Sequence, residues 1–280
     1  CPGDEVLIPE PSYVSYAPGV TFSGGVPVPV VTRAEDCFAL TPEALRIAIT
    51  PKTKALILPY PNNPTGGVMS REQLCDIAQV LEGTDIVVIS DEIYSELVYG
   101  GHKHTSFASI EGMWERTITL NGFSKAFAMT GWRVGYACGP RELIAPMFKI
   151  HQYTMLCASI MGQTAADRAL GRAFETDFED VKTMVRSYDR RRRLMVERLN
   201  GMGLTCFEPK GAFYVFPSIA STGLTSDEFC TRLLKEKHVA CVPGTAFGAS
   251  GEGHIRCSYA TSVEKLSEAL NRIEAFVKAL

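Results

Sequence analysis

Short apolar runs rich in β-branched residues alternate with helix-like segments along the first half of the chain. Such runs favour strands, and they predict strands at residues 5–8, 26–31, 54–58, 85–90, 117–120 and 134–138. Helix starts lie between them, for example at Thr41-Pro42-Glu43, where an N-cap residue precedes a proline at the first helical position. Strands separated by helices need crossover connections, so this half predicts an α/β fold with a mostly parallel sheet flanked by helices.

The pattern changes after Gly139-Pro140 to longer helices joined by short strands. Apolar residues at helical spacing predict helices at residues 141–156, 160–170, about 177–202, 227–237 and 262–280. Short strands are predicted at residues 204–207, 212–216, 239–242 and 254–259. We therefore expect a large α/β domain over residues 1–172, followed by a connecting helix and a smaller C-terminal α+β domain over residues 173–280.

The composition is that of a globular protein with a substantial core, since 46% of the 280 residues are hydrophobic and 21% are charged. The 28 Lys and Arg residues nearly balance the 31 Asp and Glu residues, so net charge provides no reason to bind nucleic acid or an anionic membrane. We interpret the arginines at 190–193 as a solvated helix face, because acids flank them on a helical pattern. No apolar run approaches the roughly 18 residues of a spanning helix, so we expect neither a nucleic-acid nor a membrane partner.

The cysteines and histidines indicate no metal or disulfide framework. The nine cysteines are an odd number and none lie at C-x-x-C spacing. This usage is typical of a reducing compartment, so we expect a cytoplasmic protein. His102 and His104 have no acid or cysteine close by in the sequence, and we interpret them as part of a surface loop.

Chemically useful side chains follow several predicted strands, at the edge where parallel sheets bind ligands. The loop at 59–67 contains three prolines and two asparagines and is constrained enough to hold a side chain for a ligand. Asp91 follows the strand at 85–90, where a carboxylate needs a cationic or hydrogen-bonding partner unless it simply caps a helix.

Two cations follow further along the chain. Lys125 lies among apolar residues after the strand at 117–120, where a lowered pKa makes a lysine a nucleophilic amine, although a solvated surface lysine is the alternative. Arg133 precedes the last strand of this half and suits an anion. Together with the acid, a phenol and an amide, these groups suit pyridoxal phosphate, which needs a lysine for its Schiff base and an acid at its ring nitrogen.

Four blocks of the sequence resemble the signature blocks of the class I/II aminotransferases. The blocks are Pro-Asn-Asn-Pro-Thr-Gly at 61–66, Ser-Asp-Glu-Ile-Tyr at 90–94, Ser-Lys at 124–125 and Gly-Trp-Arg-Val-Gly-Tyr at 131–136. These enzymes have the fold-type I architecture of the aspartate aminotransferase superfamily and depend on pyridoxal phosphate. Residues 125–140 and 151–156 look closest to the prokaryotic-type branch, which includes aspartate, aromatic and N-acetyl-diaminopimelate aminotransferases.

The resemblance implies roles around the cofactor ring for four residues. Lys125 looks like the lysine that forms the Schiff base and later acts as the base. Asp91 is expected to pair with the protonated ring nitrogen. Tyr94 and Asn63 are expected to hydrogen-bond the phenolic oxygen of the ring, and Asn63 also to contact the substrate.

Four further residues match the family at the cofactor phosphate, the ring face and the substrate. The resemblance implies that Ser124 and Arg133 bind the phosphate. Tyr13 looks like the aromatic residue that stacks on the ring. Arg256 is similar to the arginine that binds the α-carboxylate of the substrate.

The chain differs from its relatives at the start and at Gly122, where many of them have a phosphate-binding serine. Relatives carry an N-terminal arm and a glycine-containing turn before the point that matches Cys1, so we expect on the order of a hundred residues to be missing. From this chain alone we expect weaker cofactor binding, poor dimer formation and little turnover. We expect the full-length parent to be an active homodimer with a shared active site.

The expected reaction moves an amino group between an L-amino acid and a 2-oxo acid by a ping-pong mechanism through the Lys125 Schiff base. Aspartate, an aromatic amino acid or a related amino acid is the expected donor, although an arginine such as Arg256 recognises any α-carboxylate. Two alternatives stay open. One is a carbon–sulfur β-lyase with the same cofactor, and the other is a non-catalytic effector-sensing domain of a transcription regulator.

Overall fold

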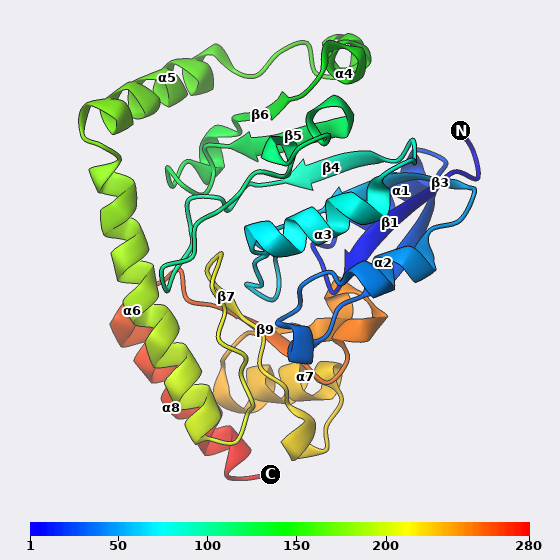
Figure 1. Ribbon diagram of the computed structural model, residues 1–280. Coiled ribbons are helices and arrows are strands. Elements are labelled where there is room, and N and C mark those ends of the chain that lie inside the picture. The colour runs from blue at the N-terminus through cyan, green and yellow to red at the C-terminus, as the bar shows by residue number, and fades with distance from the viewer.

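The larger sheet of the protein has six strands in the order β2-β1-β3-β4-β5-β6. The computed structural model describes residues 1–280 (Figure 1). The six strands are β1 (Glu5–Glu10), β2 (Val26–Val31), β3 (Thr53–Leu58), β4 (Val87–Asp91), β5 (Thr117–Gly122) and β6 (Gly135–Cys138). Strands β1 to β5 run parallel to their neighbours, and β6 pairs antiparallel with β5. The carboxyl ends of five strands therefore meet at one edge.

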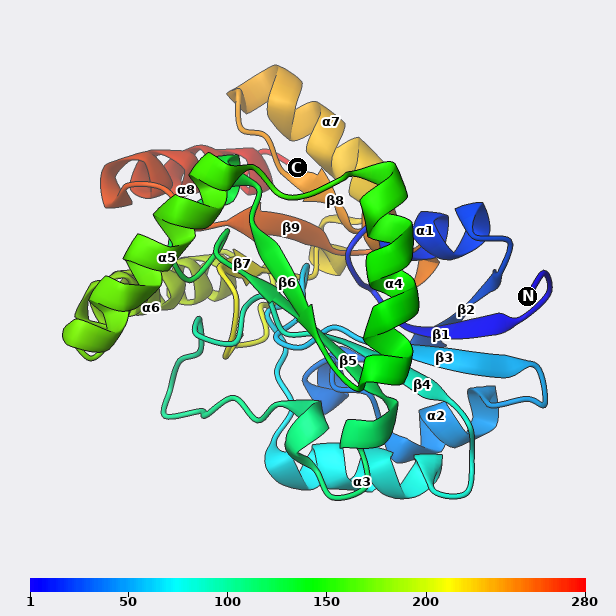
Figure 2. The ribbon, with the colours of Figure 1, turned by 90° about the horizontal axis from the view of Figure 1, so that it is seen from above.

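Helices lie on both faces of this sheet. The helices of the chain are α1 (Tyr16–Phe22), α2 (Pro42–Ala48), α3 (Arg71–Leu81), α4 (Arg141–Thr154), α5 (Ile160–Glu175), α6 (Glu179–Gly201), α7 (Ser226–Lys237) and α8 (Val263–Val277). Short 3-10 helices are η1 (Ala34–Asp36), η2 (Phe107–Ser109), η3 (Trp114–Arg116), η4 (Thr130–Trp132), η5 (Ala220–Thr222), η6 (Gly244–Phe247) and η7 (Ala249–Gly251). Figure 2 shows α2 and α3 on one side of the sheet and α1 and α4 on the other, which confirms the predicted α/β fold.

Capping residues determine where the helices beneath the sheet begin. The Thr41 hydroxyl accepts a hydrogen bond from the backbone N–H of Ala44 at the start of α2. Ser70 and Gln73 form a reciprocal capping box at the start of α3. Apolar residues of both helices then pack under the sheet, where Leu45 and Ile77 are fully buried in a core of 18 residues. This packing fixes the strands from whose ends the candidate site is built.

A second sheet and a second core occupy the C-terminal part of the chain. The strands β7 (Tyr214–Val215), β9 (Ile255–Ser258) and β8 (Val242–Pro243) form an antiparallel sheet in that order. Helices α6, α7 and α8 pack around it, and apolar residues of these helices, the strands and their connections form a core of 18 buried residues. Figure 1 shows the long helix α6 running from the level of the larger sheet down to α8.

The structure differs from the sequence-based expectations at several places. Residues 204–207 form no strand, because the side chain of Asn200 bonds both backbone groups of Cys206, at 2.8 and 3.3 Å. Helix α1 was not predicted, since it contains Pro18-Gly19. Arg192 is not on a solvated face: it is 3% exposed and bonds Asp189 and Glu208.

The structure also bears on membrane-spanning helices and on the state of the cysteines. No helix is long and apolar enough to cross a membrane. All nine cysteines are free, although the sulfur atoms of Cys241 and Cys257 lie 3.5 Å apart.

Candidate active site

A cavity of about 520 Å³ opens at the edge where the parallel strands end. All of the residues predicted for the site line this one cavity: Tyr13, Asn63, Asp91, Tyr94, Ser124, Lys125, Arg133 and Arg256. They come from both parts of the fold, since Arg256 lies on β9 of the smaller sheet. A volume in this range suits a small-molecule ligand or cofactor.

Lys125 follows β5 and points between two aromatic rings. Its Nζ lies 5.5 Å from the ring centroid of Tyr94 and 5.6 Å from that of Phe213. Burial lowers the pKa of Lys125 below its usual value, and the positive charges of Arg133 and Arg256 lower it further. This amine therefore reaches its neutral, nucleophilic form at a lower pH than a surface lysine does.

Asp91 is the last residue of β4 and carries a carboxylate with no ion-pair partner. Its Oδ2 accepts a hydrogen bond from the Tyr16 hydroxyl at 2.7 Å, and its Oδ1 accepts one from the backbone N–H of Ile93 at 3.2 Å. Burial raises the pKa of Asp91, and these hydrogen bonds oppose the rise. A half-buried carboxylate that lacks a cation suits a positively charged ligand group.

Arg256 and Asn63 meet across the two sheets. Arg256 Nη1 donates a hydrogen bond to Asn63 Oδ1 at 2.9 Å. The guanidinium carbon lies 4.6 Å from the ring centroid of Tyr214 and 4.8 Å from that of Phe247. The two rings orient the guanidinium, whose remaining donors suit a carboxylate.

Two glycines let the Asn63 loop approach the segment before β7. The carbonyl oxygen of Gly66 accepts hydrogen bonds from the backbone N–H groups of Lys210 and Gly211. A Cβ atom on Gly66 would lie 2.4 Å from Pro209 Cβ, and one on Gly211 would lie 2.4 Å from Pro61 Cβ. We call this contact the glycine seam, and it places Asn63 within reach of Arg256.

Ser124, Arg133 and Tyr13 also line the cavity, and the last two are exposed. Arg133 is exposed, and its Nη1 donates to the carbonyl oxygen of Thr130 at 2.9 Å. Tyr13 is 43% exposed and meets the ring of Tyr16 edge-on at 5.6 Å. A hydroxyl and a guanidinium at one place can hold an anion such as phosphate.

The residue after Asp91 anchors the strand end from the opposite side. Glu92 is buried and accepts hydrogen bonds from Ser90 Oγ, Ser106 Oγ and the backbone N–H of Phe107. Its Oε2 also lies 2.8 Å from His104 Nε2. His104 therefore belongs to a buried polar cluster, which corrects its interpretation as a surface-loop residue.

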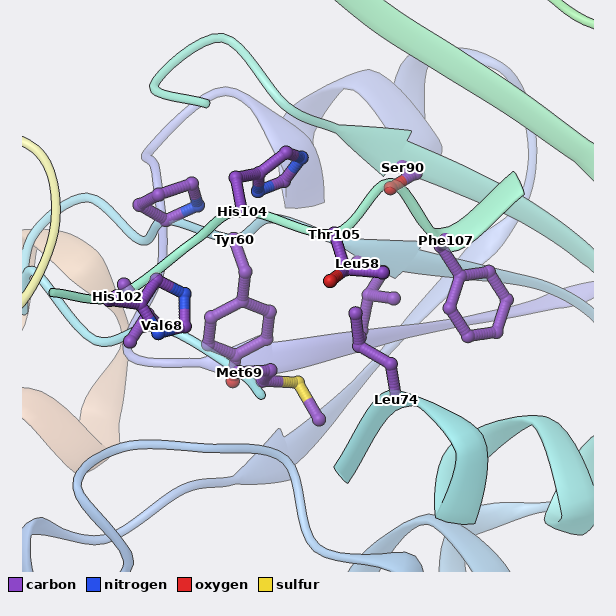
Figure 3. A pocket seen from close by; sticks show the side chains of 11 residues that line it. Leu58, Tyr60, Val68, Met69, Leu74, Ser90, His102, His104, Thr105 and Phe107 are labelled. Atoms are coloured by element: carbon purple, nitrogen blue, oxygen red, sulfur yellow. The ribbon is translucent and has the colours of Figure 1, made fainter. Parts of the chain in front are cut away.

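A small cavity lies beside this cluster (Figure 3). His102, His104 and Phe107 line it from the segment after β4, and Leu74 lines it from α3. Its volume of about 10 Å³ has room for about one water molecule. It is thus far too small for a cofactor, and the large cavity is the only one of the two that can hold one.

Sequence reasoning missed several residues of the large cavity. Tyr16 is the first residue of α1, and its position three residues after Tyr13 is the only signal that pointed to it. Tyr214, which lines the cavity, had no sequence signal. The same holds for Phe213 and Phe247, whose rings lie beside Lys125 and Arg256 without lining the cavity, because all three reach the site through tertiary packing.

The large cavity fits pyridoxal phosphate in its chemistry. It presents an amine with a lowered pKa, a half-buried carboxylate without a cation, a phenol, an amide and an exposed guanidinium. These are the groups that the aldehyde, ring nitrogen, phenolic oxygen and phosphate of that cofactor need.

Comparisons with known proteins show which family the sequence matches. The sequence matches the family of class I and II aminotransferases over residues 1–273. It is 50% identical over 276 residues to the aspartate aminotransferase of Pyrococcus abyssi, covering 99% of this chain and 70% of that protein. It is 49% identical over 275 residues to aromatic-amino-acid aminotransferase 2 of Thermococcus litoralis, covering 98% of this chain and 70% of that protein.

A solved structure shows the same fold. The crystal structure of the aromatic aminotransferase from Pyrococcus horikoshii has a TM-score of 0.96 with this chain at 49% identity, covering 100% of this chain and 74% of that chain. The fold and the donor set thus define an enzyme that depends on pyridoxal phosphate. The chain belongs to the class I and II aminotransferase family. The relatives are aminotransferases, so neither the β-lyase nor the transcription-regulator alternative is favoured.

Proposed function

We propose that this protein transfers an amino group from aspartate or an aromatic amino acid to a 2-oxo acid at the cavity described above. The observation that carries the proposal is the meeting of all the predicted site residues in one cavity. The names of the relatives support the donors, since they include aspartate and aromatic-amino-acid aminotransferases.

Each site residue has its own role toward the cofactor. When bound, the cofactor supplies an aldehyde that reacts with amines and a ring that withdraws electrons. Lys125 would bind the aldehyde, and its Nζ would later take the proton from the substrate Cα and deliver it to the aldehyde carbon of the cofactor. Asp91 would hold a proton at the ring nitrogen. Tyr94 and Asn63 would donate hydrogen bonds to the phenolic oxygen.

Binding and orientation are assigned to the remaining residues. Ser124 and Arg133 would bind the phosphate, and Tyr13 would stack on the ring. Arg256, with Asn63 beside it, would bind the substrate carboxylate. Holding the amino acid near Lys125 in one orientation removes much of the entropic barrier to proton transfer.

Chemical trapping tests the assignment of Lys125. Borohydride reduction of the protein with bound pyridoxal phosphate should attach the cofactor to Lys125, detected by peptide mass spectrometry. Lys125→Ala should abolish both the attachment and the transfer of amino groups. Lys149→Ala, which removes an exposed lysine of α4, should change neither. Attachment at another lysine, or retained transfer by Lys125→Ala, would contradict the assignment.

A panel of amino donors and 2-oxo acceptors tests the reaction and its substrates. We expect transfer with aspartate or an aromatic donor, with parallel double-reciprocal lines for a ping-pong reaction. Release of pyruvate and ammonia from a sulfur amino acid, without amino transfer, would indicate the lyase instead. Arg256→Leu should raise the KM for every donor, because all of them share the α-carboxylate.

We also propose that the protein works as a homodimer. Apolar side chains on α4, α5 and their connection are strongly exposed, as in Tyr153 at 86%, Ile160 at 71% and Met161 at 70%, and such faces are typical of interfaces. Light scattering during size-exclusion chromatography would detect the dimer, and Met161→Glu should weaken it.

Two further assignments complete the proposal. We place the boundary between a cofactor-binding domain and the smaller domain at residues 172 and 173, supported by the two separate apolar cores. We assign the protein to the cytoplasm, supported by its nine free cysteines. Proteolysis between the domains and fractionation of cells would test these assignments.

A further inference from the structure

The side chain of Tyr214 touches two functional groups with two different parts. Its ring covers one face of the Arg256 guanidinium, with 4.6 Å between the ring centroid and the guanidinium carbon. Its hydroxyl oxygen lies 3.2 Å from the hydroxyl oxygen of Tyr94. Tyr214 is 7% exposed, lines the cavity and stands at the start of β7, beside β9.

We propose that Tyr214 is a positioning residue that holds Arg256 through its ring and orients the Tyr94 proton through its hydroxyl. The inference rests on the proposed function, in which Arg256 binds the substrate carboxylate and Tyr94 donates to the phenolic oxygen of the cofactor. Tyr214 thereby links the substrate end of the cavity to the cofactor end.

The ring has a clear role because Arg256 has few other restraints. Its guanidinium makes one side-chain hydrogen bond, to Asn63, and is otherwise held between the rings of Tyr214 and Phe247. Stacking of this kind contributes modestly when exposed and more when water is excluded. Both rings are buried, so losing either one should let the guanidinium swing away from the carboxylate position.

The hydroxyl has a separate role. When two phenol hydroxyls are hydrogen-bonded to each other, one must be the donor and the other the acceptor. Tyr94 is buried, and its proton is needed for the cofactor. The arrangement that satisfies both groups has Tyr214 donating to Tyr94, which makes Tyr94 a stronger donor in turn. The charged and titratable groups around Tyr94 are Tyr16, Asp91, Lys125, Arg256 and Tyr214.

Two substitutions of this one residue separate the two roles. Tyr214→Phe keeps the ring and removes the hydroxyl, so the KM for the amino donor should stay unchanged. The midpoint of the pH-dependent change in visible absorption of bound pyridoxal phosphate should rise by roughly half a unit, because the phenolic oxygen loses part of its hydrogen bond. Tyr214→Leu should also raise the donor KM by roughly 3- to 30-fold.

Two control variants keep the test independent of folding defects. Phe247→Leu removes the other ring and should raise the donor KM without moving the absorption midpoint. Tyr259→Phe removes a buried hydroxyl that bonds the carbonyl oxygen of Ala212 outside the cavity, and it should change neither quantity. Thermal unfolding of each variant shows whether a change in KM reflects lost structure.

The outcomes distinguish this inference from the proposed function. An unchanged midpoint in Tyr214→Phe, or an unchanged KM in both leucine variants, would overturn the role of Tyr214 while wild-type protein still binds the cofactor through Lys125. Wild-type protein that fails to bind the cofactor at Lys125 would overturn the proposed function and this inference together.

Discussion

The hydroxyl of Tyr16 donates a hydrogen bond of 2.7 Å to Asp91 Oδ2. Tyr16 is the first residue of α1 and Asp91 the last residue of β4, so two elements distant in sequence meet at the base of the cavity. The bond holds the carboxylate in place and favours its charged form, against the burial that raises the pKa of Asp91.

Tyr16→Phe should therefore weaken cofactor binding. Without the hydroxyl, the pKa of Asp91 rises further. A smaller fraction of Asp91 is then charged, and its attraction for a protonated ring nitrogen is weaker. We expect the dissociation constant of pyridoxal phosphate to increase by roughly 10-fold, as loss of a hydrogen bond to a charged group implies. Fluorescence titration measures it. Tyr60→Phe removes a buried hydroxyl bonded to the carbonyl oxygen of Phe38 and should leave the constant unchanged.

Asp91→Asn should stabilise the cofactor-free protein while abolishing its activity. The pKa of Asp91 is raised by burial in the folded state, so its ionised form costs stability, and that cost appears as the pH rises above the ordinary carboxyl value of about 4. At pH 7 we expect the Tm of the variant to exceed that of wild type by about 2 °C.

The pH dependence provides the check on this prediction. The difference in Tm should shrink toward zero below pH 4, because wild-type Asp91 is then protonated in both the folded and unfolded states. Asp76→Asn, at an exposed position of α3, should show no such trend. A variant less stable than wild type at pH 7 would contradict the argument.

Glu92→Ala should destabilise the protein strongly. The buried carboxylate accepts hydrogen bonds from two serine hydroxyls and the Phe107 N–H, and it also contacts His104. Its removal leaves the two hydroxyls and the N–H without an acceptor. We expect the free energy of unfolding in urea to fall by roughly 3–5 kcal/mol. Asp180→Ala breaks the exposed 2.7 Å pair with Arg172 and should leave that free energy nearly unchanged. Equal losses in the two variants would show that burial of Glu92 is unimportant.

Gly66→Ala should damage both stability and substrate binding. Gly66 and Gly83 have nearly equal φ values, +73° and +71°, but a Cβ atom meets Pro209 only at Gly66. Gly83→Ala should cost roughly 1–2 kcal/mol from the backbone alone. Gly66→Ala should cost roughly 1–3 kcal/mol more from overpacking and raise the donor KM, since Asn63 would shift. Similar behaviour of the two variants would indicate that the glycine seam tolerates a side chain.

Much of the fold could be predicted from local pattern. The strand at 26–31 and the helix start after Thr41 are confirmed, because β-branched runs and capping hydrogen bonds act over a few residues. The site residues at the strand ends also meet in one cavity, as the parallel arrangement predicted. Their roles toward the cofactor stay predictions.

The remaining features depend on tertiary packing. Arg192 is buried because Glu208, from a later segment, neutralises its charge. The helical pattern around Arg192 contains no information about that partner. Tyr214 reaches Tyr94 only because β7 is placed beside the end of β4. Side-chain hydrogen bonds from Asn200 likewise replaced the strand expected at 204–207.

Lys125 follows β5 of the larger sheet and Arg256 lies on β9 of the smaller one, and the glycine seam joins the loop after β3 to the segment before β7. A slight rotation at the seam would change the distance between Lys125 and Arg256, which a bound substrate has to span. Substitutions at Gly211 or Pro209 can therefore alter which amino acids are accepted, although neither residue lines the cavity. Evolution of a new preference in this enzyme thus has a route that leaves every catalytic side chain in place.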